Sequence, residues 1–494
     1  MDPSYKARKE AFVSNLSGSD IWDINAVSLV APASVLLWSA LQSRLSFFSP
    51  YGPAGLLTDF ILNVLAILFA TTAYSSAPGL LNIFLISPAV LLFLTQNRLR
   101  SPQKAKPPRK SNAKRIDTRE AESLPVHPFL TTYRAAMMVI TCVAILAVDF
   151  RVFPRRFGKV ENWGTSLMDL GVGSFVFSAG VVSARAILKT RASKSPKKAF
   201  LTRLLGSVRH SVPLLVLGLI RLWSVKGLDY AEHVTEYGVH WNFFFTLGFL
   251  PPFVEIFDTL STFIPSYEAL AMGICILYQV VLESTDLKSW ILISPRGSDL
   301  ISKNREGIFS FVGYLAIFLA GRGVGIRIIP RGNSVNKTAQ QGRNSVLTSL
   351  GLQAAFWSTM FFFNSTYAFG YGANIMVSRR LANMPYVLWV AAFNSVQLLL
   401  FCLIETVFFP SVHRSIGKEA EEEQRFATSR ILQAFNRGGL AIFLVANLLT
   451  GVVNLSVPTL DIDHPLAMAI LVGYAAILTA LALGMDKFNI KLRL

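Results

Sequence analysis

The stretch DFRVFPRRFGKVENWGTSLMDLGVGSFVFSAGVVSAR, residues 149–185, decides how this chain is organised. An apolar run long enough to cross a membrane ends at Asp149, and a second such run follows a short connector. The connector carries four cations, Arg151, Arg155, Arg156 and Lys159. Charge of this density is costly to hold next to hydrocarbon. We therefore expect this stretch to form the functional site of the protein and the rest of the chain to enclose it.

The whole chain has the composition of a protein that crosses a membrane many times. Of its 494 residues, 52% are hydrophobic and only 15% are charged, and the mean hydropathy is +0.47. Soluble domains carry roughly 25% charged residues. A helical bundle satisfies all backbone hydrogen bonds inside a bilayer. The composition thus predicts an all-α fold, with residues 1–494 forming one integral-membrane domain.

Several classes of function are excluded by composition and motif. The net charge of +18 could suggest nucleic-acid binding, but the cations lie in short loops between apolar segments, where they set topology and meet lipid headgroups. The three cysteines lie inside apolar runs and the six histidines show no ligand spacing, so neither a disulfide framework nor a metal is expected. No GxSxG, Walker A or HExxH motif occurs in a suitable context. Group transfer between amphiphiles, without a bound cofactor, and transport remain.

Thirteen membrane spans are predicted at about 17–25 apolar residues per crossing. The seventh is interrupted by Pro251-Pro252, which makes a broken helix or two half-spans possible there. The predicted spans are 24–42, 54–74, 78–97, 129–149, 165–187, 208–226, 241–260, 267–284, 307–326, 346–364, 384–409, 434–455 and 464–485.

The distribution of loop cations predicts the orientation of the chain. An odd number of spans puts the termini on opposite sides, and a cytosolic C-terminus gives the cytosolic loops about twice as many Lys and Arg residues as the other side. We therefore expect a lumenal tail at 1–23 and a flexible basic cytosolic loop at 101–128. The 150–164 connector then lies on the lumenal side, where its cations oppose the positive-inside rule. Binding of an anionic group would explain that exception.

The connector offers a possible catalytic pair. A carboxylate at Asp149 in a poorly hydrated site can act as a general base toward a hydroxyl. Lys159 could orient that carboxylate or stabilise an oxyanion, although a helix-end charge beside a snorkelling lysine would look the same in sequence. The guanidinium groups of Arg155 and Arg156 match phosphate geometry, or they contact headgroups without specificity.

Further candidates flank the pair. Asp169 is an acid inside the fifth span, where charge usually serves function, and small residues on the same helix allow close helix packing or an acyl chain alongside. The polar residues before the seventh span could contact a sugar headgroup, or they could be ordinary residues of the belt at the membrane interface. Two sequons, at Asn15 and Asn454, lie on the predicted lumenal side. The remaining candidate substrate-binding residues are Trp163, Ser174, Ser178, His240, Asn242 and Asn447.

Three segments resemble one known family. They are YKARKEAFVSNLSGSDIWDINAV at 5–27, the 147–185 block, and ANLLTGVVNLS at 446–456. They are similar to the GPI-anchor inositol acyltransferases. The resemblance implies a multi-pass enzyme of the endoplasmic reticulum membrane. Such an enzyme moves a long fatty acyl group, usually palmitoyl, from palmitoyl-CoA to the inositol 2-hydroxyl of glucosaminyl-phosphatidylinositol. The family's thirteen spans and lumenal N-terminus agree with the count above.

The resemblance also assigns roles. The family's proposed catalytic aspartate and lysine fall on Asp149 and Lys159. Asp149 would take the hydroxyl proton, while Lys159 would either hold Asp149 or stabilise the thioester oxyanion. Arg155 and Arg156 would meet a phosphate of the acceptor or of CoA. Three alternatives stay open: a lipid or anion transporter, an acyltransferase that uses a buried histidine (His233 or His240), and a non-enzymatic assembly subunit.

Overall fold

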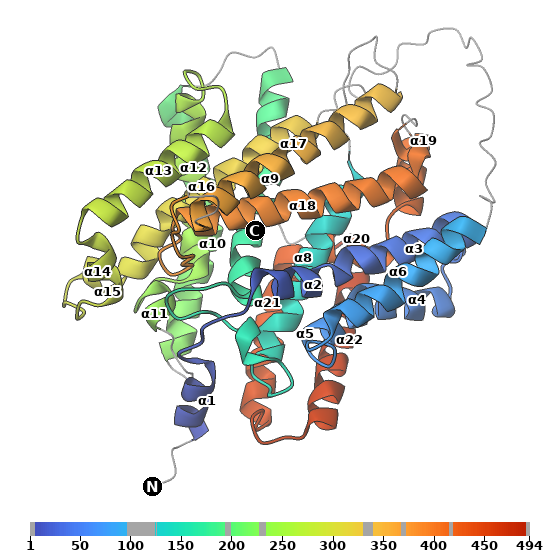
Figure 1. Cartoon of the computed structure of the whole chain (residues 1–494), viewed down its shortest axis with the longest axis horizontal. Coiled ribbons are helices and arrows are strands. Elements are labelled where there is room, and N and C mark those ends of the chain that lie inside the picture. The colour runs from blue at the N-terminus through green and yellow to red at the C-terminus, as the bar shows by residue number, and fades with distance from the viewer. Residues whose placement is uncertain are drawn as a thin grey trace.

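The computed structural model describes residues 5–95, 124, 126–192, 199–226, 234–329, 339–366, 372–413 and 418–490, and within these ranges the regular structure is entirely helical. The α-helices (Figure 1) are α1 (Tyr5–Val13), α2 (Ile21–Ser28), α3 (Val30–Leu45), α4 (Pro53–Phe60), α5 (Ala66–Thr71), α6 (Pro78–Thr95), α8 (Pro128–Ala147), α9 (Leu167–Ala192), α10 (Phe200–Lys226), α11 (Val234–Tyr237), α12 (Phe243–Leu260), α13 (Tyr267–Ser284), α14 (Leu287–Leu292), α15 (Leu300–Lys303), α16 (Arg305–Ile328), α17 (Ala339–Ser365), α18 (Met384–Phe408), α19 (Lys418–Phe426), α20 (Arg430–Arg437), α21 (Gly439–Ser456) and α22 (His464–Lys487). A π-helical turn at Ile61–Leu65 joins α4 to α5, and short 3₁₀ turns occupy Arg155–Phe157 and Pro410–His413.

Within the described residues, thirteen helical segments are long and apolar enough to cross a membrane, which confirms the predicted number and the all-α class. Boundaries differ from the prediction at several spans, most at the sixth and at the tenth, which begins at Ala339. The sixth begins at Phe200, earlier than predicted. The twelfth begins at Gly439 because the helix is interrupted at Gly438, which leaves Arg437 on α20. Arg437 is exposed and pairs with Asp486 at 2.6 Å.

The seventh span is one continuous helix. α12 passes through Pro251 and Pro252 without ending, so the alternative of two half-spans is wrong. The two prolines remove two hydrogen-bond donors from the helix, but α12 is anchored at its start, where the Asn242 side chain accepts from the backbone N–H groups of Phe244 and Phe245. α10 packs along its length.

The centre of the bundle is the contact between α9 and α16. A Cβ placed on Gly180 would lie 2.1 Å from the Phe318 carbonyl oxygen, and one on Gly321 would lie 2.2 Å from that of Phe177. Only glycine allows the two backbones to approach this closely, as small residues do in membrane helix pairs. The predicted close packing of the fifth span is therefore present and is centred on Gly180. Gly171, one turn after the start of α9, has no neighbouring atom where its Cβ would be.

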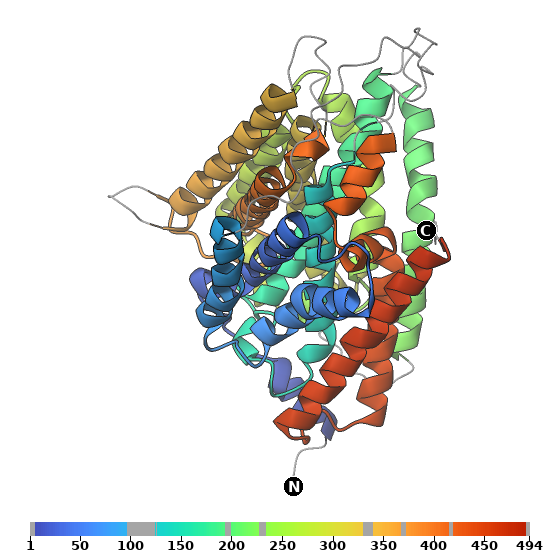
Figure 2. The same ribbon diagram turned by 90° about the vertical axis from the view of Figure 1, so that its right-hand side faces the viewer.

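Segments from distant parts of the sequence gather at one end of the molecule. α1, the connector between α8 and α9, and the loop between α21 and α22 lie toward the end marked by the N-terminus (Figure 1). After a 90° turn, the lower ends of α21 and α22 still lie beside the N-terminus (Figure 2). This end of the bundle holds the charged residues that the sequence singled out.

Candidate active site

The connector that carries Lys159 is fixed from two directions. The backbone N–H of Val160 donates to Asp169 Oδ2 at 3.0 Å, which ties the connector to the start of α9. On its other side, the Ser378 hydroxyl and the Arg380 guanidinium donate to the backbone and side-chain oxygens of Asn162, at 2.6 and 2.7 Å. The loop before α18 thus acts as a scaffold that determines where Lys159 points.

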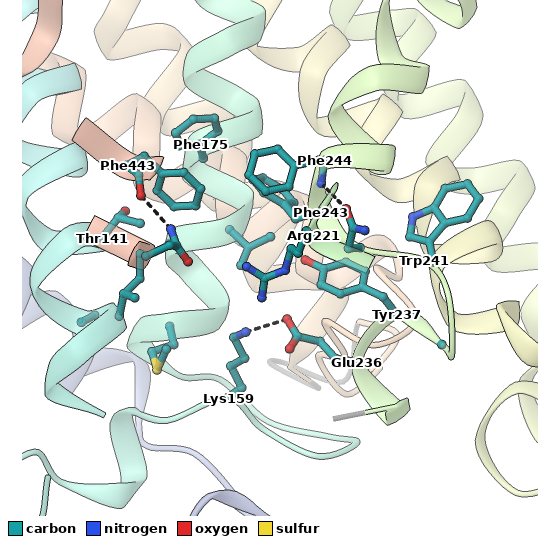
Figure 3. A pocket seen from close by; sticks show the side chains of 18 of the residues that line it. Thr141, Lys159, Phe175, Arg221, Glu236, Tyr237, Trp241, Phe243, Phe244 and Phe443 are labelled. Carbon is teal, nitrogen blue, oxygen red and sulfur yellow. Dashed lines mark hydrogen bonds and ion pairs between the residues drawn. The ribbon is translucent and has the colours of Figure 1, made fainter. Parts of the chain in front are cut away.

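Two adjoining pockets meet at this connector. The first, of about 310 Å³, is mainly apolar, and Figure 3 shows aromatic rings at one end and Lys159 facing Glu236 at the other. The second, of about 470 Å³, is richer in charged groups. We call them the apolar pocket and the polar pocket. The residues that line both are Ile145, Lys159, Met168, Arg221, Glu236 and Asn447.

Lys159 is the first member of a chain of alternating charges. Its Nζ lies 2.7 Å from Glu236 Oε1, the same oxygen lies 3.4 Å from an Arg379 guanidinium nitrogen, and Arg379 Nε lies 2.5 Å from Asp169 Oδ1. Burial by itself lowers the pKa of Arg379, but the Glu236 and Asp169 carboxylates outweigh it and raise that pKa well above its ordinary value. Arg379 therefore remains charged and fixes both acids.

Asp149 lies in the polar pocket, two residues after the end of α8. Asn454 of α21 donates from Nδ2 to Asp149 Oδ2 at 2.8 Å. Lys9 of α1 donates to Asn454 Oδ1 at 2.6 Å, and its Nζ is 3.9 Å from Asp149 Oδ1. An asparagine and a lysine from opposite ends of the chain thus orient the carboxylate. This arrangement favours the oxyanion role for Lys159 over the role of orienting Asp149.

α1 forms one wall of the polar pocket. Tyr5, Lys9, Phe12 and Val13 all line it. Arg155 of the connector lies over the Phe12 ring at 5.5 Å from the centroid. Its guanidinium also donates to backbone carbonyls in and just after α1, at 3.4 and 3.5 Å. Arg155, predicted as a phosphate ligand, is placed so that it holds α1 against the connector.

Three other predicted residues line the apolar pocket: His240, Asn242 and Asn447. Asn242 is also the N-cap of α12, and its Nδ2 donates to the Gly218 carbonyl of α10 at 2.9 Å. Asn447 lines both pockets, and its Nδ2 donates to the carbonyl of Phe443 in its own helix at 2.7 Å. His233, the other histidine considered, lies outside the described residues.

The other predicted residues are engaged away from both pockets. Arg156 pairs with Asp23 at 2.7 Å and donates to the Ser75 carbonyl at 2.7 Å. Trp163 packs beside α13 and α14. Asp169, although fully buried, acts through Val160 and Arg379 as described above. Ser174 and Ser178 are buried within the bundle on α9.

Sequence reasoning missed four charged residues of the polar pocket: Lys9, Glu161, Arg221 and Arg379. Arg379 carried a usable signal, because Arg379-Arg380 falls in a predicted lumenal loop against the positive-inside rule, as the connector does. Lys9 carried none, since it lies in a polar tail. Among the described residues, no group of three or more His, Cys, Asp or Glu is placed to hold a metal ion.

Replacing Arg379 by methionine is expected to destabilise the protein by about 3–5 kcal/mol, because it leaves Asp169 buried without its partner charge. Thermal unfolding of the detergent-solubilised protein measures the change. The matched control is Arg437→Met, whose ion pair with Asp486 is half exposed and should contribute less than about 1 kcal/mol. Equal losses in the two variants would contradict a structural role for the Arg379–Asp169 pair.

Fold and site together define a many-span helical membrane protein with an amphiphile-sized cavity and a charged group at the junction of its apolar and polar parts. Comparison with known sequences specifies the class: the GWT1 family profile matches residues 5–485. The chain belongs to the GWT1 family, the GPI inositol acyltransferases of GPI-anchor biosynthesis.

Curated relatives match over their whole length. GPI-anchored wall transfer protein 1 of Aspergillus oryzae is 70% identical over 100% of both chains. Its counterpart in Aspergillus fumigatus is 69% identical over 99% of each chain, and the one in Candida albicans is 41% identical over 100% of each. The chain is thus a multi-pass membrane enzyme, and the transporter and assembly-subunit alternatives are set aside.

Proposed function

We propose that this enzyme transfers a palmitoyl group from palmitoyl-CoA to the inositol 2-hydroxyl of glucosaminyl-phosphatidylinositol. The observation that carries the proposal is the position of Lys159 where the apolar and polar pockets adjoin. A thioester carbonyl at that junction would place its acyl chain in the apolar pocket. The inositol headgroup would enter the polar pocket, where Asp149 lies.

The wall of the apolar pocket suits an acyl chain. Phe175, Phe243, Phe244 and Phe443 line it, and Phe175 packs edge-on against Phe243 with ring centroids 5.7 Å apart. Gly171 contributes no side chain to the wall. A surface of this kind gains free energy from burying methylene groups, at about 0.8 kcal/mol for each one.

The residues of the junction divide the chemistry between them. Asp149 takes the proton of the 2-hydroxyl as its oxygen attacks the thioester carbonyl carbon. The ammonium of Lys159 stabilises the negative charge that develops on the carbonyl oxygen. The C–S bond then breaks, the ester forms, and the CoA thiolate leaves and takes up the proton that Asp149 received. The side chains that hold these two groups are Asn454 and Lys9 for Asp149, and Glu236 for Lys159.

We assign this end of the bundle to the lumen of the endoplasmic reticulum, on the strength of the loop-charge bias and the family. The two sequons of this face differ in structure. Asn15 is exposed in the turn after α1, whereas the Asn454 amide bonds Asp149 and Lys9. A glycan is therefore compatible with Asn15 and incompatible with the site at Asn454.

Purified enzyme with palmitoyl-CoA and glucosaminyl-phosphatidylinositol tests the proposal. Free CoA thiol should appear in equal amount with acylated lipid. The acylated lipid should resist phosphatidylinositol-specific phospholipase C, which uses the inositol 2-hydroxyl as its nucleophile. Thiol release that does not depend on the acceptor, or a product still cleaved by the phospholipase, would contradict the proposal.

A further inference from the structure

Three acidic side chains line the polar pocket, and one of them has no partner among the residues that the structure describes. Asp149 accepts from Asn454, and Glu236 is bound by Lys159 and Arg379. The Glu161 carboxylate, in contrast, forms no hydrogen bond or ion pair with the part of the chain that the structure describes, although its residue lines the pocket and is only partly exposed.

The backbone that carries Glu161 is held firmly. Its own N–H donates to the Leu16 carbonyl at 3.1 Å. The preceding N–H, of Val160, is bound by Asp169, and the following residue, Asn162, is bound by Ser378 and Arg380. A free carboxylate on a fixed backbone is a preorganised acceptor, which is the arrangement expected where a cavity recognises a cationic group.

The nearby cations do not satisfy this carboxylate. Lys9 donates to Asn454, Lys159 pairs with Glu236, and Arg379 pairs with Glu236 and Asp169. The fourth cation that lines the pocket, Arg221, forms no ion pair with Glu161. A charge within a partly enclosed cavity is costly unless it is paired. A hydrogen-bonding cation on a molecule that enters the pocket would supply the partner that Glu161 lacks among the described residues.

We propose that Glu161 binds the ammonium group of the acceptor's glucosamine and so selects the amino sugar. This inference rests on the proposed function. The sugar is bonded directly to the inositol ring that carries the reacting hydroxyl, so its amine must lie within the same pocket as Asp149. A volume of about 470 Å³ accommodates a headgroup of two rings. An anionic phosphate would be repelled from the same position.

Recognition by a carboxylate predicts a particular selectivity. A neutral sugar in the same place would leave Glu161 desolvated and unpaired, and sites built for a charged hydrogen bond reject analogues that lack it. The loss should be about 10- to 100-fold in kcat/KM, the effect of one charge-assisted hydrogen bond. An acyl-CoA donor of another chain length should leave this ratio unchanged, because the apolar pocket does not contain Glu161.

Three acceptors test the inference: glucosaminyl-phosphatidylinositol, its glucosyl analogue with a hydroxyl in place of the amine, and the N-acetylated form. Wild-type enzyme should prefer the amine over the glucosyl analogue by about 10- to 100-fold. Glu161→Gln should reduce that preference to about threefold or less, mainly by raising KM for the amine. The matched control, Asp286→Asn, removes an exposed acid outside both pockets and should preserve the selectivity.

Each outcome has a distinct meaning. A Glu161→Gln enzyme that keeps wild-type selectivity overturns the inference, as does a wild-type enzyme that acylates the amine and glucosyl acceptors equally. Should the variant not accumulate, competition of wild-type enzyme by soluble glucosaminyl-inositol and glucosyl-inositol measures the same ratio, and equal inhibition overturns the inference. Absence of acyl transfer to all acceptors by wild-type enzyme would instead contradict the proposed function.

Discussion

Replacing Asp149 by asparagine is expected to lower kcat for inositol acylation by about 10²- to 10⁴-fold, the contribution of a positioned general base. Asparagine has nearly the same shape and can still accept the hydrogen bond that Asn454 donates, but its amide cannot take the hydroxyl proton. Incorporation of labelled palmitate into glucosaminyl-phosphatidylinositol measures the loss. Because Asp149 is outside the apolar pocket, KM for palmitoyl-CoA should change little.

Two further variants separate loss of the base from damage to the fold. Asp286→Asn removes an exposed acid away from both pockets and should leave transfer at the wild-type rate. Asp149→Glu keeps the carboxylate but displaces it by one methylene, and a misplacement of about 1 Å can cost about 100-fold. If Asp149→Asn retains the wild-type rate at an equal amount of protein, Asp149 is not the base.

The spans could be predicted because a bilayer imposes a length on every crossing. The connector was identifiable because its cations oppose the positive-inside rule. The positive-inside rule does not show, however, which of several cations in one loop faces a cavity. Arg155 and Arg156 resemble Lys159 in charge and position, yet the structure places them against α1 and against Asp23 of α2. Which cation faces a cavity depends on packing that one sequence does not reveal.

The partners of the proposed catalytic pair, Asp149 and Lys159, could not be predicted for a related reason. Asp149 is held by Asn454, which is 305 positions away, and Lys159 by Glu236, which is 77 positions away. Pairings at such separations depend on how the helices are arranged in the bundle, and no local periodicity encodes them. The resemblance to the family could therefore identify Asp149 and Lys159, but it could not show that a different side chain holds each of them.

The second large effect is expected at Lys159, which is held by a different side chain from the one that holds Asp149. Replacing Lys159 by methionine is expected to lower kcat by about 10²- to 10³-fold, because the carbonyl oxygen at the junction of the pockets would lose its stabilising charge. Lys159→Ala should lose as much, and added methylammonium should restore part of its activity by occupying the vacated space. Lys159→Arg should recover little, since a planar guanidinium does not replace a compact ammonium. Methylammonium should not rescue Asp149→Asn.

The double variant Asp149→Asn/Lys159→Met distinguishes the two roles considered for Lys159. If the lysine only oriented Asp149, its removal from an Asp149→Asn enzyme would cost nothing further, because the base is already gone. If it stabilises the oxyanion, the double variant should be slower than Asp149→Asn alone by an additional factor of about 10 or more. The structure favours the additional loss, because Lys159 is bound to Glu236 at 2.7 Å while Asn454 and Lys9 orient Asp149. Equal rates for the single and double variants would show that Lys159 only orients Asp149.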